Sequence, residues 1–415
     1  MTSKAGAPLS DLLVLDLTRA LAGPIAGRML SDLGATVIKV EPPDGDLTRT
    51  TKPRQDSMAV YYAQANVGKR CVSIDLRTED GRALFLQMVE RADIVLENYR
   101  PGVMHRLGLG YEVLSAVNPG IIVGSISGFG HGNVWSHRGA FAAAAQAEAG
   151  ITADIAKRRN VAPRNDPVSQ ADVYAGMSCL GAVLAAVHHR SVTGEGQAVE
   201  VDMVEAAMLA NDMTSSNLRV DQDVTDGFRS GSNWPPCYQL ASGRWITVTA
   251  DPAVDGPFGL YTRAMDRRDL REDPRFVDMP ARVANLEELN RLIGEWIATM
   301  DSAAEVEAAI GNSTVLVADV RTAAEIRETK WAEERGAFFE VEHRPGTDPI
   351  TLPQTPWRFN KSPSGAVPRL SFRGEDNRSV LQELLGLSDG EVADLTDREI
   401  ISDRVPEWRR QEPGR

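Results

Sequence analysis

The chain has very little cysteine. Its 415 residues include three cysteines, Cys71, Cys179 and Cys237, which are widely separated along the sequence. Their spacing fits neither a disulfide framework nor the Cys-x-x-Cys pairs of structural zinc sites. This scarcity excludes a disulfide-rich secreted domain and indicates a reducing compartment.

Long apolar runs and an excess of positive charge are also lacking. No uninterrupted apolar run reaches about 18 residues, the length that a membrane-spanning helix needs. Residues 1–17 lack the basic start and apolar core of a signal peptide. The net charge of −13 argues against a general nucleic-acid binder or a protein of anionic membrane surfaces. We expect a cytoplasmic protein with no nucleic-acid or membrane partner.

The common nucleotide and metal motifs are missing as well. Neither GxxxxGK[ST] nor GxGxxG follows a predicted strand, and the loop after the first strand reads RALAGP (19–24). The two histidines of HHR (188–190) are adjacent rather than four residues apart, so they form a poor metal pair. His131 and His137 lie in a glycine-rich loop, where a histidine is usually solvated. We predict no metal site.

What is present is the composition of an ordinary globular protein, 42% apolar and 25% charged. A chain of this length predicts two or three domains. The polar, aperiodic stretch 220–236 is typical of a linker or loop. We therefore predict a large domain over 1–220, a small domain with linkers over 221–335 and a C-terminal segment over 336–415.

The first half of the chain alternates between strand and helix periodicities. Strands are predicted at 12–18, 36–41, 71–76, 93–98, 121–127 and 197–203, with helices at 24–34, 81–92, parts of 103–117, 170–190 and 204–213. This alternation predicts an α/β fold with a parallel sheet and right-handed crossovers. The small domain combines a strand at 244–250 with amphipathic helices at 286–300 and 302–310, and the tail adds a strand at 338–343 and a helix at 379–387.

The predicted helix QADVYAGMSCLGAVLAAVHHR (170–190) carries one acidic residue near its start, Asp172. Aspartate is a favoured N-cap, which is the simplest interpretation. The third helical position would then be Ala175, so there is no capping box. Small neighbours such as Ala171 and Gly176 would let a bulky ligand approach closely. From the residues alone, a cap and a chemical role both stay open.

Several blocks of the sequence, in their joint order, resemble the family III CoA-transferases, the formyl-CoA and carnitine CoA-transferase type related to the α-methylacyl-CoA racemases. These blocks are 9–49, 66–82, 92–130, 172–208 and, more weakly, 273–293 and 355–370. The resemblance implies a large Rossmann-like domain to which the C-terminal segment returns, and a smaller α+β domain. It also implies a homodimer of two interlocked rings, with each active site between the large domain of one chain and the small domain of its partner.

The resemblance implies that Asp172 is the catalytic nucleophile. An ionised carboxylate needs no base to attack a thioester at neutral pH. The attack on an acyl-CoA would give a mixed anhydride and then an aspartyl-CoA thioester, from which a carboxylic acid takes the CoA. Helix N-terminal N–H groups can stabilise the negative charge. The implied substrates are an acyl-CoA and a carboxylic acid, with coenzyme A as the carried group and no metal.

A set of residues is implied to bind CoA. Arg77 and Arg106 suit its phosphates because a guanidinium binds phosphate in a bidentate manner. Small residues such as Gly139 and Ala140 suit walls of the pocket that the backbone lines. The full set is Leu21, Ala22, Ile74, Asp75, Leu76, Arg77, Asn98, Tyr99, Arg100, Arg106, Gly139 and Ala140.

The sequence departs from the family pattern at several positions. Phe141 replaces the histidine that racemases pair with the aspartate, which disfavours α-proton exchange because that reaction needs two acid/base groups. Ala142 replaces an acid found in many transferases. Leu21 stands where formyl-CoA transferase has glutamine, and only RSGSN (229–233) corresponds to its glycine-rich loop. We therefore expect an apolar acyl group rather than oxalate or formate.

Two alternatives to a CoA-transferase remain. The first is a 2-methylacyl-CoA racemase or isomerase, in which His137 would replace the missing histidine. The second is a non-catalytic CoA-binding homologue, suggested by Ala142. A racemase would exchange the α-proton of its substrate with solvent without any CoA acceptor, and a binding protein would not depend on Asp172.

Overall fold

The computed structural model describes residues 6–159, 161–218, 237–311 and 315–410. The linker 220–236 and the predicted loop 229–233 therefore lie outside the described residues. The chain divides into two compact units. Unit 1 comprises Met1–Ile151, Asn165–Thr214 and Lys330–Arg415, and unit 2 comprises Thr152–Arg164 and Ser215–Thr329.

Unit 1 is built on a six-stranded sheet in which every neighbouring pair of strands is parallel. Across the sheet the strands are β5 (Arg70–Ser73), β2 (Thr36–Glu41), β1 (Leu13–Asp16), β6 (Ile94–Glu97), β7 (Ile122–Ser127) and β8 (Ala198–Asp202). The predicted α/β fold class is confirmed. The order of the strands reverses between β1 and β6, and open parallel sheets bind their ligands beyond the carboxyl ends of the strands at such a switch point.

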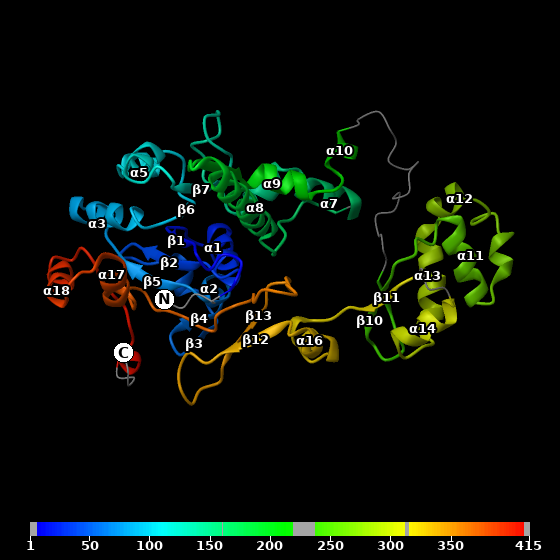
Figure 1. The fold of residues 1–415 in the computed structure, drawn as a ribbon. Helices are drawn as coiled ribbons and strands as arrows, with labels where there is room; N and C mark the ends of the chain where they lie inside the picture. Colours follow the sequence, from blue (N-terminus) through cyan, green and yellow to red (C-terminus); the bar gives the residue numbers. More distant parts are fainter. Residues whose placement is uncertain (1–5, 160, 219–236, 312–314, 411–415) are drawn as a thin grey trace. The chain divides into compact units, whose positions relative to one another are not determined.

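Helices cover both faces of this sheet (Figure 1). On one face α8 (Gln170–Thr193) packs against β7, β8 and α1 (Ala22–Asp32). On the other, α3 (Glu79–Val89), α5 (Tyr111–Val117) and α17 (Asn377–Leu385) enclose the main apolar core. Fully burying one of the large side chains of this core stabilises the fold by about 1.5–3 kcal/mol.

Two glycines allow α8 to approach its neighbours closely. A Cβ atom at Gly124 of β7 would lie 2.9 Å from Cγ2 of Val183 on α8. A Cβ atom at Gly176 of α8 would lie 2.6 Å from the carbonyl oxygen of Ala22. These contacts hold the start of α8 beside the start of α1.

By length and composition, α8 is apolar enough to span a membrane. The sequence criterion of an uninterrupted apolar run did not identify it, because Gly176, Ser178 and Gly181 interrupt the apolar residues. In this fold α8 is a core helix of unit 1, in contact with α1 and the sheet. It extends beyond the predicted end to Thr193, where Gly194 adopts a left-handed conformation (φ 81°) that terminates the helix.

The other elements of unit 1 are short. They are η1 (Leu47–Thr50), β3 (Arg54–Gln55), β4 (Met58–Ala59), α2 (Val60–Asn66), α4 (Val103–Arg106), α6 (Ala142–Glu148), α9 (Met203–Ala210), α16 (Lys330–Arg335), β12 (Phe338–Val341), β13 (Ile350–Pro353), α18 (Asp389–Asp397) and α19 (Glu407–Arg410). The hairpin β12–β13 and α2 contribute to a second apolar cluster. The C-terminal segment thus packs within unit 1.

Unit 2 has its own core. Its antiparallel sheet contains β9 (Cys237–Gln239), β10 (Trp245–Val248) and β11 (Val317–Asp319), and its helices are α11 (Asp255–Ala264), η3 (Arg268–Arg271), α12 (Met279–Ala284), α13 (Leu286–Ile297), α14 (Ala303–Ile310) and α15 (Ala323–Arg327). Most of α7 (Ile151–Arg159) and the end of α10 (Thr214–Asn217) also belong to this unit. On α13, Leu289, Ile293 and Ile297 recur every four residues and are fully buried.

A buried carboxylate in unit 1 leads to a prediction about acid stability. Glu41 accepts hydrogen bonds from Arg49 Nε and Nη2, each at 2.8 Å, and this ion pair holds the pKa of Glu41 at about 2 against burial, which raises it. The lowered pKa contributes about 3 kcal/mol of stability above pH 4.5, at roughly 1.4 kcal/mol per pKa unit. We expect Glu41→Gln to lose this stability at pH 7. The loss should shrink as the pH falls from 4.5 towards 2, because wild-type Glu41 becomes protonated.

Urea unfolding of both proteins at pH 7, 4 and 3 measures this difference. Glu295→Gln is the control, because Glu295 pairs with Arg291 on the exposed surface of α13. Exposed pairs contribute about 0–1 kcal/mol. Equal unfolding midpoints for wild type and Glu41→Gln at pH 7 would contradict the prediction.

Candidate active site

Most of the predicted site residues lie in loops that follow four strands of the parallel sheet. Leu21 and Ala22 follow β1, Ile74–Arg77 follow β5, Asn98–Arg100 follow β6, and Gly139 and Ala140 follow β7. Because the strands are parallel, these loops leave the same edge of the sheet. The structure therefore brings these segments, which are far apart in the sequence, to the carboxyl edge.

The loops after β1 and β6 are joined directly at the switch point. Asn98 Oδ1 accepts the backbone N–H of Arg19 at 2.8 Å, and Asn98 Nδ2 donates to the carbonyl oxygen of Arg19 at 2.8 Å. The amide of Asn98 thus pairs with the backbone as a neighbouring strand would. This side chain sets the distance between the two loops.

The interpretation of Asp172 as an N-cap is wrong. The helix begins at Gln170, Ser169 is its N-cap, and Asp172 lies in the first turn. The earlier start is possible because Gln146 of α6 accepts the backbone N–H of Ala171 at 3.3 Å through Oε1. The carboxylate of Asp172 is therefore not needed to cap its own helix.

Asp172 instead lies at the starts of two other helices. Its carboxylate is stabilised in the charged form by the backbone N–H groups of Ala22, the first residue of α1, and Ala142, the first residue of α6, which lower its pKa. The N-caps of these helices are Leu21 and Phe141, whose apolar side chains cannot accept a hydrogen bond. The first N–H groups of the two helices, which a capping side chain does not normally reach, remain available to stabilise Asp172.

The electrostatics of Asp172 combine two opposing effects. The residue is only 7% exposed, and burial raises the pKa of its carboxyl group. The N–H groups of Ala142 and Ala22 lower this pKa, but by less than burial raises it. The result is a poorly solvated carboxylate at the positive ends of helix dipoles, an environment suited to a nucleophile that passes through anionic states.

The segment after β6 contacts the segment after β7. A Cβ atom at Gly139 would lie 2.6 Å from Nη2 of Arg100, so the guanidinium covers the glycine. A Cβ atom at Gly128 would lie 2.5 Å from the Cβ atom of Ala140. Ala140 thus packs directly on the backbone of Gly128, whereas the guanidinium beside Gly139 ends a flexible side chain that can shift.

The segment after β5 mixes core and surface residues. Ile74 and Leu76 are buried in the main apolar core, and the backbone N–H of Asp75 donates to the carbonyl oxygen of Ile400. Arg77 is exposed and binds Asp75 through Nε and Nη2, each at 2.8 Å. Because an exposed pair of this kind is worth little, a phosphate can compete for the guanidinium.

The remaining predicted residues differ in exposure. Arg106 lies at the exposed end of α4 with its Nη1 close to Gly102. Tyr99 packs at the rim of the main core, and burial raises its pKa to about 12, so the phenol stays neutral. The ring of Phe141 is 68% exposed beside Asp172.

The sequence interpretation missed Tyr61. Its hydroxyl interacts with the side chain of Ser169, and the charge of Asp172 contributes to raising the pKa of the phenol. Tyr61 lies at the start of α2, a helix of seven residues that follows a two-strand hairpin. Elements this short have no periodicity that marks them, and nothing local signals that Tyr61 lies near Asp172.

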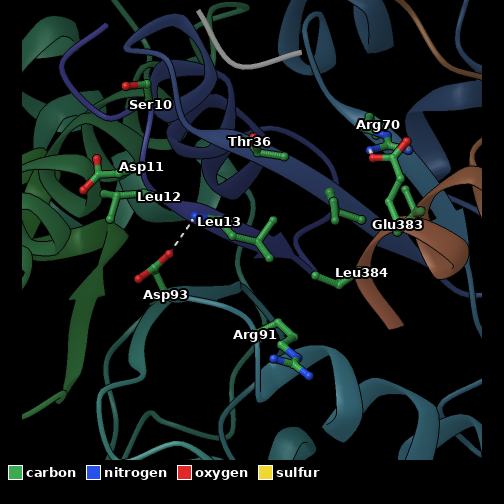
Figure 2. Close-up of a pocket in the computed structure, with 12 residues that line it drawn as sticks. Ser10, Asp11, Leu12, Leu13, Thr36, Arg70, Arg91, Asp93, Glu383 and Leu384 are labelled. Atoms are coloured by element: carbon green, nitrogen blue, oxygen red, sulfur yellow. Dashed lines mark hydrogen bonds and ion pairs between the residues drawn. The ribbon is translucent and has the colours of Figure 1, made fainter. Parts of the chain in front are cut away.

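A cavity at the opposite edge of the sheet contains none of the predicted residues. It has a volume of about 220 Å³ and lies at the amino ends of β1, β2 and β5 (Figure 2). Ser10, Asp11, Leu12, Leu13, Thr36, Ile38, Arg70, Arg91, Asp93, Val380, Glu383 and Leu384 line it. The cavity and the cluster around Asp172 are therefore at different edges of the sheet.

The family described as "CoA-transferase family III" matches residues 9–377 of the chain. Among proteins of known activity, succinyl-CoA:mesaconate CoA-transferase of Haloarcula hispanica is 33% identical, over 92% of this chain and 97% of its own. Succinyl-CoA–D-citramalate CoA-transferase of Chloroflexus aurantiacus is 31% identical, over 95% of this chain and 98% of its own.

A solved structure leads to the same family. The CAIB/BAIF family protein from Brucella suis superposes with a TM-score of 0.78 at 29% identity, covering 91% of this chain and all of that chain. Similarity in sequence and in structure extends over both units. The protein belongs to CoA-transferase family III.

Proposed function

We propose that the protein moves coenzyme A from an acyl-CoA to a free carboxylic acid through covalent intermediates on Asp172. The observation that carries this proposal is a carboxylate that is buried without a cationic partner among the causes of its pKa and whose charge the N–H groups of Ala22 and Ala142 stabilise. Carboxylates that serve only as structural partners are normally paired with a cation or cap their own helix. Asp172 caps another pair of helices through their first N–H groups, where a ligand anion would also be stabilised.

In the proposed reaction, an oxygen of Asp172 attacks the thioester carbonyl carbon of the donor. The C–S bond breaks, CoA leaves as a thiolate, and a mixed anhydride forms. The thiolate then attacks the side-chain carbonyl carbon of Asp172 and releases the donor acid, leaving an aspartyl-CoA thioester. The acceptor carboxylate repeats these steps in reverse, which forms the new acyl-CoA and restores the carboxylate of Asp172.

The N–H groups of Ala22 and Ala142 have a role in the steps at the carbonyl carbon of Asp172. When a thiolate or carboxylate attacks this carbon, negative charge develops on its oxygen, which the nearby N–H groups stabilise. Fixed backbone donors of this kind stabilise an oxyanion without reorganising. The role needs no side chain at position 142, so the replacement of an acid by Ala142 does not argue for a non-catalytic homologue.

The proposed CoA site uses the loops at the carboxyl edge. Arg77, Arg100 and Arg106 supply cations for the phosphates, while Asn98 and Tyr99 shape the loop between them. Leu21, Ala22, Gly139 and Ala140 line the path to Asp172, and Ile74 and Leu76 anchor the segment that carries Asp75 and Arg77. The reaction proceeds without metal.

For the substrates we propose succinyl-CoA and a short, methyl-branched dicarboxylic acid. The relatives named above act on mesaconate and D-citramalate. The apolar side chains of Leu21 and Phe141, the residues before Ala22 and Ala142, suit a methyl-bearing carbon chain. The exposed phenylalanine in place of an acid/base group also disfavours a racemase. We further propose that the enzyme is a cytoplasmic homodimer.

A trapping experiment tests the mechanism. The protein is incubated with succinyl-CoA and then with hydroxylamine or borohydride, and its peptides are analysed by mass spectrometry. We expect a hydroxamate or a reduced side chain at Asp172, formed only in the presence of acyl-CoA. An unmodified Asp172 in a preparation that turns over its substrate would rule the mechanism out.

A further inference from the structure

The loop between β1 and α1 has a conformation that requires support. This loop, Leu17–Leu21, leads into Ala22, whose N–H is directed at Asp172. Ala20 has a φ of 66°, a left-handed conformation that is unfavourable for a residue with a side chain. Something in the surrounding structure must therefore hold the loop in place.

Two buried lysines hold carbonyl groups on either side of this residue. Lys39 Nζ donates to the carbonyl oxygen of Thr18 at 2.7 Å, and Lys69 Nζ donates to that of Pro24 at 2.8 Å. Their exposed fractions are 0% and 2%. The other two donors of Lys69 bind Asp16 Oδ2 at 2.7 Å and Asn66 Oδ1 at 2.9 Å, so its ammonium group is fully used.

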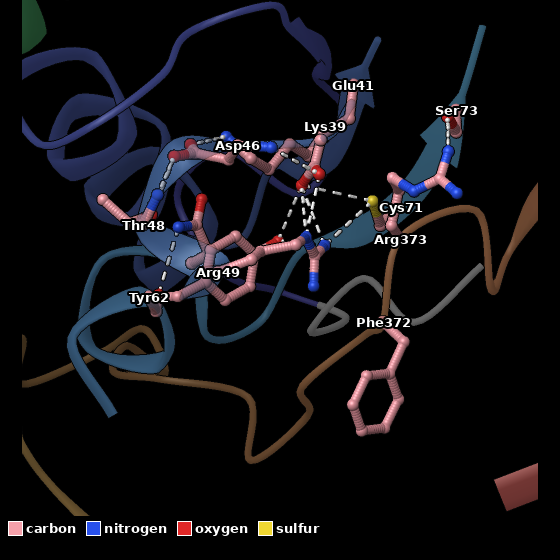
Figure 3. Close-up of polar contacts among 12 residues, drawn as sticks. Lys39, Glu41, Asp46, Thr48, Arg49, Tyr62, Cys71, Ser73, Phe372 and Arg373 are labelled. Carbon is pink, nitrogen blue, oxygen red and sulfur yellow. Dashed lines mark hydrogen bonds and ion pairs between the residues drawn. The ribbon is translucent and has the colours of Figure 1, made fainter. Parts of the chain in front are cut away.

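Two buried carboxylates hold the N–H groups of the same loop. Asp16 Oδ1 accepts the backbone N–H of Thr18 at 2.9 Å, and Asp46 Oδ1 accepts that of Ala20 at 3.3 Å. Asp46 Oδ2 also lies 3.1 Å from Lys39 Nζ, a contact visible in Figure 3. The loop is thus bound on its carbonyl side by cations and on its N–H side by anions.

Stability alone does not account for this cluster. Bringing charged groups out of water is unfavourable, and apolar residues of similar volume often replace a buried ion pair without loss of stability. The cost of burial is evident at Lys69, where it lowers the pKa of the ammonium group to about 8 in spite of Asp16. A cluster that is costly to bury and converges on one loop points to a role in placing that loop.

We propose that Asp16, Lys39, Asp46 and Lys69 are positioning residues for the transfer reaction. They fix the Leu17–Leu21 loop and the first turn of α1, which holds the backbone of Ala22 beside the start of α8 and its N–H near the carboxylate of Asp172. None of the four is placed in contact with the substrate or the reacting atoms. The proposal rests on the proposed function of Asp172.

The double variant Asp16→Leu/Lys69→Met tests this role. It replaces one ion pair by apolar side chains of similar size, so it should fold. We expect kcat to fall about 10- to 100-fold because the Ala22 N–H is no longer held at the reacting carboxylate, while the Kd for CoA changes by less than about twofold. The acid limb of the pH–rate profile should move to higher pH, since one N–H that lowers the pKa of Asp172 is lost.

A second double variant, Lys39→Met/Asp46→Asn, reaches the same loop through the other ion pair. It keeps the Oδ1 acceptor on which Ala20 and Thr48 depend. The control is Arg70→Met/Glu383→Gln, which removes an ion pair of 2.7 Å at the amino edge of the same sheet (Figure 2). We expect this control to keep both the wild-type kcat and the wild-type acid limb.

The readouts separate this proposal from the proposed function. The pKa of Asp172 is also measured without substrate, from the pH dependence of its modification by a carbodiimide, followed by mass spectrometry. A raised pKa in either loop variant supports the positioning role even if wild-type transfer does not depend on Asp172. A folded loop variant with wild-type kcat and an unchanged pKa of Asp172 would overturn the proposal.

Discussion

Asp172→Ala is expected to lower kcat for CoA transfer by about four to six orders of magnitude, the scale of losses seen when an enzyme loses its covalent nucleophile. The groups that stabilise this carboxylate are backbone N–H donors, which cannot replace the lost oxygen. The variant should still bind CoA, since Asp172 is proposed to attack the acyl carbon rather than to hold the nucleotide. Initial rates with succinyl-CoA and a dicarboxylic acid, together with calorimetric titration by CoA, measure both properties.

Asp93→Ala is the matched control for this loss. Asp93 is a partly buried aspartate of unit 1 that pairs with Arg190 at 3.0 Å, but it lies at the amino edge of the sheet. Its replacement should reduce stability and leave kcat within about twofold of wild type. A kcat for Asp172→Ala within tenfold of wild type would refute the nucleophilic role.

The second large effect is expected from a substitution that removes only a backbone hydrogen. Ala142→Pro deletes the N–H that α6 directs at Asp172 and should lower kcat about 100- to 1,000-fold, as does the loss of one oxyanion donor in other enzymes. Proline is well tolerated at the first position of a helix. The preceding residue, Phe141, already has the extended conformation (φ −121°, ψ 168°) that proline demands.

Two variants control for the proline itself. Ala142→Gly retains the N–H and should keep most of the activity. Ala303→Pro makes the same change at the first residue of α14, whose N-cap Ser302 is also extended (φ −142°, ψ 154°). Melting temperatures of all three variants show whether the fold is kept. If folded Ala142→Pro retains the wild-type kcat, the backbone donors have no part in the reaction.

Much of the fold follows from the sequence because the strands of a parallel sheet are continuous apolar runs. β1, β6 and β7 are buried along almost their whole length, and each is followed by a helical pattern. Shorter elements were not predictable in this way. α11, for example, begins Asp-Gly-Pro, and although proline is tolerated in a first turn, this composition is typical of a loop.

The candidate site was predictable only in part, for a physical reason. That loops after parallel strands share an edge follows from topology, so grouping Asn98, Arg100 and Gly139 needed no coordinates. The donors to Asp172 belong to the backbone, and backbone groups leave no mark on residue type.

The burial of Lys39 could not be predicted from its residue type or from its neighbours in the sequence. Lys39 stands in the strand Thr-Val-Ile-Lys-Val-Glu, where a charged residue between apolar ones is typical of a solvent-facing position. It is nevertheless fully buried, because Asp46 and the carbonyl oxygen of Thr18 replace its hydration. These partners come from loops whose positions the sequence does not indicate, so the side chain of Lys39 lies in the core and not in solvent.

Leu21 and Phe141 are the N-caps of the two helices whose first N–H groups stabilise Asp172, and their side chains take no part in that stabilisation. In the proposed mechanism the main chain supplies the electrostatic environment of Asp172, and of all side-chain exchanges only one to proline removes an N–H group. The side chains at these two positions are left free to be matched to the acid that is used. New acceptor acids could therefore be accommodated by varying these two residues without changing Asp172 or the backbone N–H groups beside it.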